Sequence, residues 1–231
     1  MRKCIFTIFE PWNTKIIKQD DFTVDTIKQI LGDLSKKRPI FHSEADFQHA
    51  LAWEIHQKLN KIDIRLEKRF MVNTLDEIYV DIYLKLKNVS IVIETKYTTK
   101  KLEIELNGEE FVLKDHRGLT ERRKDFLYDI YRLEKLKNEK KITKGYAIFL
   151  TNNPSYWTQP QKDTNDKDFR IHQDRNIEPN RLLQWAEKTS EGTKKGRERP
   201  LKFEKEYSFK WTPYSSSKDN NYEFKYLLVE V

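Results

Sequence analysis

The stretch "VSIVIETKYTTK" (residues 89–100) decides how the rest of this chain is interpreted. Its first half, from Val89 to Ile93, is rich in β-branched residues, as expected for a buried strand. Glu94 and Lys96 then follow two positions apart, and because side chains alternate along a strand, both point to one face. An apolar strand can carry a carboxylate and an ammonium group only if a partner or a function compensates for their burial.

The preceding run "EIYVDIYLKL" (residues 77–86) predicts a neighbouring strand, and only two residues separate the two runs. A tight hairpin of this length pairs Leu86 with Val89. The same register places Asp81 directly opposite Glu94, so two carboxylates are expected to meet on adjacent strands.

The predicted alternation puts Val80 and Ile82 on one face of the first strand and Asp81 on the other. Opposed residues have Cβ atoms about 4.5–5.5 Å apart, and like charges at that distance destabilise a sheet. Asp81 and Glu94 must therefore share a proton, contact a cation or bind a metal. A hard cation such as Mg²⁺ suits carboxylate oxygens. The alternative is an ordinary salt bridge, in which Lys96 neutralises one acid on a solvated face.

The remaining patterns predict a single α/β domain. Helices are expected at residues 23–35, 42–59, 119–138 and around 180–188, and strands at residues 4–9, 64–72, 77–86, 89–97, 145–152, 201–211 and 222–231, with a hairpin at residues 102–113. Residues 1–152 should form the core with an N-terminal extension. Residues 153–231 should form a C-terminal extension, rich in loops and with some β-structure, that packs on the same domain.

The run "VDIYLKLKNVSIVIETK" (residues 80–96) resembles the signature of the PD-(D/E)xK nuclease superfamily, in which an Asp precedes a hydrophobic strand that carries Glu-x-Lys. Over about residues 40–152, the expected order of helix, three antiparallel strands, helix and strand is similar to the restriction-endonuclease-like core. Val80 stands where some members have a Pro. The resemblance implies a nuclease that depends on Mg²⁺, with Mn²⁺ as a substitute.

The same resemblance implies a role for each residue of the motif. Asp81 and Glu94 would be metal ligands, and the backbone carbonyl of Thr95 would complete the set. Lys96 would position or activate the attacking water, or stabilise charge on the phosphate. Glu44, at the start of the first core helix, would be a further catalytic acid. The alternative for Glu44 is an acid that complements the helix dipole.

Basic residues near the start of the helix at residues 119–138 suggest a path for a polyanion. Arg122, Arg123 and Lys124 oppose the helix dipole, and contact with phosphates would compensate for this. The alternative is a solvated cationic face. Gln48, one turn after Glu44, would also contact the nucleic acid or would simply be a polar surface residue. Three further residues of the helix are expected to face the polar side of the sheet: Tyr128, Asp129 and Arg132.

The composition limits the class of protein. A net charge of +7 and a pI near 9.2 over 231 residues suit a polyanionic partner, and we expect DNA. No apolar run approaches the roughly 20 residues that cross a bilayer, so no membrane partner is expected. The single cysteine, Cys4, rules out a disulfide framework and fits a reducing, cytoplasmic compartment. A homodimer would suit cleavage of two strands. The alternatives are an inactive nucleic-acid-binding module on the same fold and a scaffold in which the charged residues form ordinary salt bridges.

Overall fold

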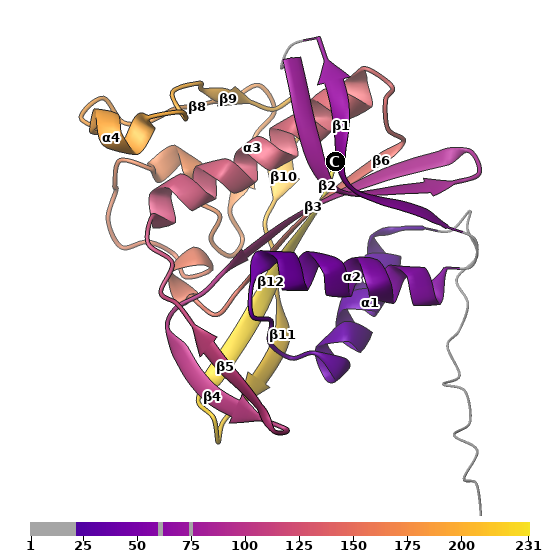
Figure 1. Cartoon of the computed structure of the whole chain (residues 1–231). Coiled ribbons are helices and arrows are strands. Elements are labelled where there is room, and N and C mark those ends of the chain that lie inside the picture. The colour runs from indigo at the N-terminus through magenta and orange to yellow at the C-terminus, as the bar shows by residue number, and fades with distance from the viewer. Residues whose placement is uncertain (1–21, 60–61, 74–75) are drawn as a thin grey trace, which may run out of the picture.

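The computed structural model describes residues 22–59, 62–73 and 76–231, so the strand expected at residues 4–9 lies outside the described residues. Six strands form the main sheet: β1 (Asp63–Val72), β2 (Asp76–Leu86), β3 (Val89–Thr98), β6 (Lys144–Thr151), β11 (Trp211–Ser217) and β12 (Tyr222–Glu230). Their order is β1-β2-β3-β6-β12-β11 (Figure 1). β3 and β6 are parallel and the other neighbours are antiparallel, so the protein has a mixed α/β fold.

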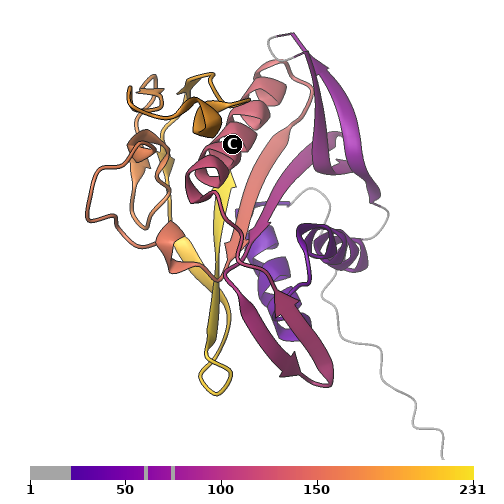
Figure 2. The same ribbon diagram turned by 60° about the vertical axis from the view of Figure 1, so that its left-hand side comes forward.

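Helices cover both faces of this sheet. α1 (Val24–Lys37) and α2 (Glu44–Lys58) lie on one face, and α3 (Leu119–Asn138) lies on the other (Figure 2). The remaining elements are short: β4 (Leu102–Leu106), β5 (Glu109–Leu113), β7 (Asn176–Ile177), β8 (Leu182–Leu183), α4 (Glu191–Lys194), β9 (Leu201–Lys202) and β10 (Tyr207–Ser208). The order from α2 to β6 is therefore helix, three antiparallel strands, a hairpin, helix and strand.

Local sequence signals account for several of these boundaries. Ser43 caps α2 by accepting a hydrogen bond from the Asp46 N–H, as predicted. The β4–β5 hairpin turns at Asn107 and Gly108, whose φ angles of 53° and 81° are those of the expected two-residue turn. Gly145, the second residue of β6, lies where α3 approaches closely, since a Cβ there would lie 3.2 Å from the Leu133 Cβ.

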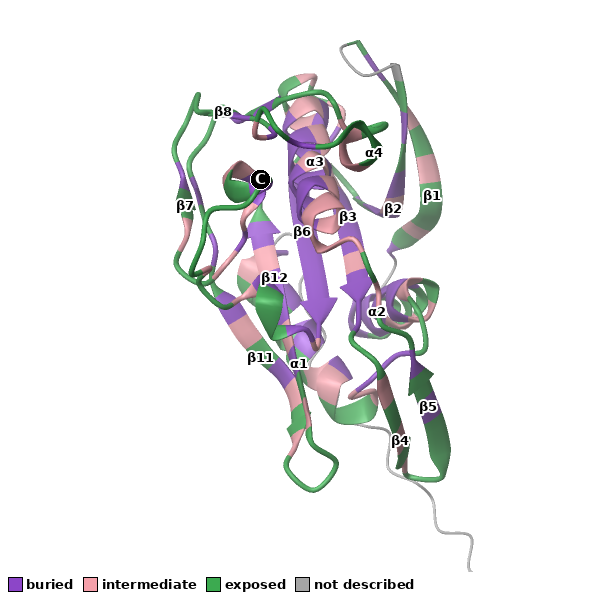
Figure 3. Cartoon of the chain, turned by 90° about the vertical axis from the view of Figure 1, so that its left-hand side faces the viewer, coloured by how far each residue is buried: buried purple, intermediate pink, exposed green. Residues whose placement is uncertain are grey.

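The sheet separates two hydrophobic cores. On β3, Ile91 and Ile93 pack in the core beneath α1 and α2, whereas Val92 packs in the core beneath α3. β3 and β6 are buried on both faces, as the purple strands in the centre of Figure 3 show. This position explains why both strands read as continuous apolar runs without alternation.

β2 changes faces at Asp81. Ile78 and Val80 belong to the α3 core, but Ile82 and Leu84 belong to the α1–α2 core. The prediction that Val80 and Ile82 share a face is therefore wrong. The reason is that the first half of β2 turns away from β3 and continues with β1 alone, as a two-stranded arm.

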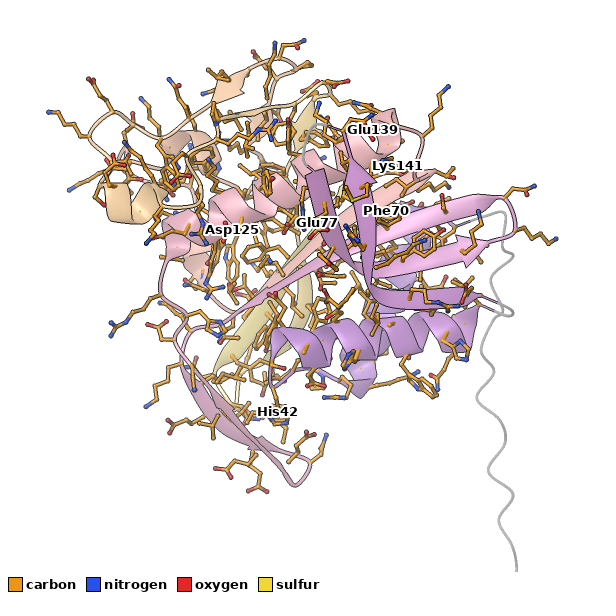
Figure 4. The ribbon with its side chains drawn as sticks, turned by 45° about the horizontal axis from the view of Figure 1, so that its top comes forward. His42, Phe70, Glu77, Asp125, Glu139 and Lys141 are labelled. Carbon is orange, nitrogen blue, oxygen red and sulfur yellow. The ribbon has the colours of Figure 1, made fainter. Side chains whose placement is uncertain are left out.

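The arm extends toward the C-terminal end of α3. There the Lys141 ammonium donates to the Met71 carbonyl, and the Asn73 N–H donates to a Glu139 oxygen at 2.9 Å. Figure 4 labels Glu139 and Lys141 next to the arm. These contacts fix the arm against α3 and keep β2 apart from β3 beyond Asp81.

The C-terminal region belongs to the same folded unit. β12 pairs with β6, and β11 pairs with β12, so residues 211–230 complete the main sheet. The segment before them covers α3, where buried Glu134 accepts a hydrogen bond from the Tyr207 hydroxyl at 2.8 Å. The helix expected around residues 180–188 is not formed, because this stretch pairs as β8 with β9. Among the described residues, every helix is too short or too polar to span a bilayer.

Candidate active site

The candidate site lies where β2 and β3 separate. The predicted register is confirmed over the five pairs that end at Ile82–Ile93. Asp81 and Glu94 come one step later, where the strands diverge, so the two acids lie at a gap in the sheet. The Asp81 N–H points toward the Glu94 carboxylate, with 3.5 Å between N and Oε2.

The Asp81 carboxylate crosses this gap to β3. Its Oδ2 accepts hydrogen bonds from both the N–H and the hydroxyl of Thr95, each at 2.7 Å. A backbone N–H that loses its strand partner needs another acceptor, and Asp81 provides one. Thr95 is thus confirmed as a neighbour of Asp81, while the role of its carbonyl as a metal ligand stays a prediction.

Glu94 is the most deeply buried acid of the site, with 2% of its surface exposed. Arg132 of α3 contacts it, with 3.0 Å between Nη2 and Oε1, and the same Nη2 lies 2.8 Å from Oδ1 of Asp129. Burial raises the pKa of Glu94 well above its ordinary value, and the charges of Asp129 and Asp81 raise it further. Burial likewise raises the pKa of Asp129. Arg132 and Lys96 oppose these shifts but do not cancel them.

Lys96 lies between two carboxylates from different helices. Its Nζ is 3.6 Å from Oε1 of Glu44 and 3.7 Å from Oδ2 of Asp129. Burial disfavours the charged amine, but the surrounding acids outweigh this effect, so the pKa of Lys96 is raised. Lys96 is therefore a fixed ammonium group. In this state it can orient water or stabilise an anion.

Glu44 reaches the site because α2 begins beside the end of β3. Its second oxygen, Oε2, accepts the N–H of Tyr97 at 2.7 Å. The Tyr97 hydroxyl in turn donates to the Phe41 carbonyl at 2.8 Å, which fixes the chain just before α2. The structure thus brings Glu44 beside Lys96, and the role of Glu44 as a catalytic acid near a metal, which the resemblance implies, stays a prediction.

Gln48 does not lie on an open surface, because only 8% of it is exposed. Its Nε2 donates to the Asp81 carbonyl at 2.8 Å and to Oε1 of Glu67 at 3.1 Å. Glu67 stands across from Asp81 on β1 and has a φ of 50°, at the point where β2 bends. The prediction of a nucleic-acid contact for Gln48 is therefore wrong, and Gln48 instead positions the bend that carries Asp81.

Two of the three basic residues at the start of α3 are also buried. Arg123 is 3% exposed and forms an ion pair with Asp166 at 2.6 Å. Lys124 is 2% exposed and donates to the carbonyls of Arg197 and Arg199. They are buried because the segment after β6 folds over this end of the helix. The prediction that these two residues contact phosphates is wrong.

Arg122 is the basic residue of this group that remains partly exposed. Its Nε donates to the Arg117 carbonyl at 3.2 Å. A contact between Arg122 and nucleic acid stays a prediction.

The sequence did not indicate that Asp129 and Arg132 belong to the site. Their side of the helix was correctly expected to face the polar side of the sheet, but no role was assigned to them. The available signal was an acid and a base three positions apart on the helix. Only the packing of α3 against β3 shows that they meet Glu94 and Lys96.

The oxygens at the gap match the ligand preference of a hard cation. Among residues 22–59, 62–73 and 76–231, no group of three or more His, Cys, Asp or Glu side chains is arranged as a ready metal site. The two carboxylates and the Thr95 carbonyl are nevertheless the oxygen donors that Mg²⁺ prefers. The raised pKa of Glu94 indicates that further positive charge would be stabilising there. A metal ion would compete with Arg132 for this carboxylate.

Comparisons of the chain with protein-family models, with curated proteins and with solved structures found no match. The function is therefore inferred from the chemistry of the site.

Proposed function

We propose that this chain is a Mg²⁺-dependent nuclease of the PD-(D/E)xK type that acts on DNA. One observation carries the proposal: Asp81, Glu94, Lys96 and Glu44, which come from three different elements, gather where β2 and β3 separate. A structural salt bridge would need one acid and one base. Here four carboxylates, including that of Asp129, surround only two cations, Lys96 and Arg132.

Each residue would have a distinct task in phosphodiester hydrolysis. Bound Mg²⁺ would supply a Lewis acid and lower the pKa of a water molecule. Asp81, Glu94 and the Thr95 carbonyl are the residues that would hold it. Lys96, as a fixed ammonium, would stabilise negative charge on the phosphate. Glu44 and Asp129 would hold the Lys96 side chain in place from either side.

The order of elements also supports the proposal. α2, β1, β2, β3, α3 and β6 follow one another as in the restriction-endonuclease-like core, with the β4–β5 hairpin inserted before α3. The net charge of +7 suits a nucleic-acid substrate in a cytoplasmic setting. We propose DNA as the polymer and a homodimer as the form that cuts both strands.

One observation favours a second candidate, an inactive nucleic-acid-binding module on the same fold. Arg132 already supplies a cation to Glu94 and Asp129 at 3.0 and 2.8 Å. If Arg132 permanently takes the place of a metal, the protein would keep its charged cluster but would not hydrolyse nucleic acid.

The test is incubation of the protein with circular DNA, linear DNA and RNA, with Mg²⁺, with Mn²⁺ and with a chelator. We expect cleavage of DNA that the chelator stops and that Asp81→Asn abolishes. Asp63→Asn serves as a matched control, because Asp63 is an exposed acid on β1 whose side chain pairs with Arg65. Binding of DNA without cleavage in either metal would instead support the inactive module.

A further inference from the structure

A pocket of about 350 Å³ adjoins the candidate active site. Glu44 and Tyr97 form the wall that it shares with the site, and Glu44 in turn lies beside Lys96. The opposite wall comes from the end of the β4–β5 hairpin and from the start of α3. His42 also lines the pocket, and Figure 4 labels it between α2 and this hairpin.

The pocket lining is basic. Lys114, His116 and Arg122 line it, and Glu44 is the acid among the lining residues. The Glu44 carboxylate is already engaged by the Tyr97 N–H and by Lys96. Arg122 donates its Nε to the Arg117 carbonyl at 3.2 Å. Its other N–H groups and the Lys114 ammonium can contact an anionic ligand.

Thr99, the residue that follows β3, holds the basic segment in a fixed position. Its hydroxyl donates to the Lys114 carbonyl at 2.7 Å, and its carbonyl accepts the His116 N–H at 2.8 Å. Its own N–H donates to Nδ1 of His116 at 3.0 Å. Thr99 is 2% exposed, so these bonds are shielded from water. The hairpin end is therefore preorganised next to the catalytic strand.

The bond from Thr99 also determines the state of the His116 ring. Because Nδ1 accepts a hydrogen bond, the proton of the neutral ring lies on Nε2, which is then a donor. Burial and the nearby Arg122 lower the pKa of His116, which keeps the ring neutral near pH 7. The pocket thus combines one neutral donor with two cations, a set suited to phosphate oxygens.

We propose that this pocket binds the phosphate of a nucleic-acid strand that flanks the phosphodiester at Lys96, with Lys114, His116 and Arg122 as its contacts. This inference rests on the proposed function, because the cleaved bond is placed at Lys96. In this proposal, the β4–β5 hairpin, which is inserted between β3 and α3, guides the substrate strand. The flanking contact would fix the register of the strand relative to the catalytic residues.

The test measures equilibrium binding of the full chain to 3′-labelled single-stranded DNA in the presence of a chelator. Lys114→Ala/Arg122→Ala should weaken binding about tenfold. The slope of log affinity against log salt should fall in magnitude by about 0.7, the value expected for the loss of one phosphate contact on a single strand. Lys28→Ala/Lys36→Ala is the charge-matched control, since both lysines are exposed residues of α1. It should change affinity less than twofold. Equal losses in the two double variants would overturn the proposal.

Further measurements distinguish a failure of the pocket proposal from a failure of the proposed nuclease activity. They also distinguish a phosphate within the strand from a terminal phosphate. Because binding is measured without a divalent ion, a protein that binds through the pocket but never cleaves would refute the proposed activity and leave the pocket as a phosphate site. The same loss is expected for 5′-phosphorylated DNA, for 5′-hydroxyl DNA and for circular single-stranded DNA that carries an internal label. A loss confined to the 5′-phosphorylated strand would show a site for a terminal phosphate and would overturn the flanking assignment. Lys114→Gln/Arg122→Gln, checked by thermal melting, must give the same result as the alanine pair.

Discussion

Asp81 and Glu94 show how residues that destabilise a sheet can be retained in one. Their register would place two carboxylates in direct opposition, yet the strands separate at that step. Asp81 then bonds to Thr95, and Glu94 bonds to Arg132. The separation relieves the direct repulsion, but it leaves buried negative charge that a divalent cation could compensate.

Replacing Glu94 with Gln should stabilise the fold and abolish activity. A carboxyl group whose pKa is raised on folding binds its proton more tightly in the native state. Wild type therefore loses stability as the pH rises from the ordinary glutamate pKa, near 4.5, through the raised value. The variant lacks this loss, so its advantage should grow between pH 5 and pH 8 and reach about 2–4 °C in Tm.

The measurement is thermal melting followed by circular dichroism across this pH range. Glu77→Gln is the control, because Glu77 is an exposed acid of β2 that pairs with Arg69. A Glu94→Gln variant that melts below wild type at pH 8 would show that the bond to Arg132 outweighs the cost of burial.

Replacing Arg132 with Gln tests whether this residue and a metal share one position. The change leaves Glu94 and Asp129 without their shared cation, and breaking such a buried pair costs about 3–5 kcal/mol. Mg²⁺ binds only the folded state, so it should restore part of the lost Tm. We expect Mg²⁺ to raise the Tm of the variant more than that of wild type. Equal shifts in differential scanning calorimetry would count against a metal at Glu94.

At the scale of elements, the three consecutive basic residues at the start of α3 lie in two different environments. Arg122 is partly exposed beside the pocket, whereas Arg123 and Lys124 point into the segment after β6. One turn of helix therefore faces both the substrate pocket and the interior. The hairpin end and α2 complete the wall around the partly exposed Arg122.

Arg122→Ala and Arg123→Ala should behave differently. Arg123 and Asp166 are 3% and 0% exposed in their side chains, so removal of the arginine should destabilise the protein by about 3–5 kcal/mol. Arg122→Ala should change stability by less than about 0.5 kcal/mol and weaken DNA binding. Urea unfolding and a binding titration on each variant provide the measurements. A large loss of stability in Arg122→Ala would contradict this division.

At the scale of the whole molecule, the C-terminal region is part of the structure that builds the site. β12 lies beside β6, and β6 lies beside β3, the strand that carries Glu94 and Lys96. Without β12, the buried strand β6 would become an exposed edge. The segment that follows β6 also covers the outer side of α3, which supplies Asp129 and Arg132.

A chain that ends after residue 152 should therefore fail to fold. It retains all the residues of the motif but loses the partner of β6 and the cover of α3. We expect loss of near-ultraviolet circular dichroism and aggregation of this fragment, whereas the full chain remains folded under the same conditions. A soluble, cooperative fragment of residues 1–152 would show that the C-terminal region is dispensable.

The sequence by itself determined the helices and strands of residues 23–152 and the register of the central hairpin, but not the short elements between residues 176 and 208. Apolar runs, the Ser43 cap and the two-residue turn before Val89 are local signals, and local signals suffice for helices, strands and tight turns. The same signals predicted that Asp81 and Glu94 would come close together, whereas a place for Glu44 near the site was implied only by the resemblance.

Only the tertiary structure decided which polar residues belong to the site. Separation of β2 from β3, packing of α3 on the sheet and the cover provided by residues 153–209 are contacts between distant segments. They bring Asp129 and Arg132 to the acids, and they bury Gln48, Arg123 and Lys124. The identity of a charged residue does not indicate whether its side chain faces water or a buried partner, because burial depends on what packs against it.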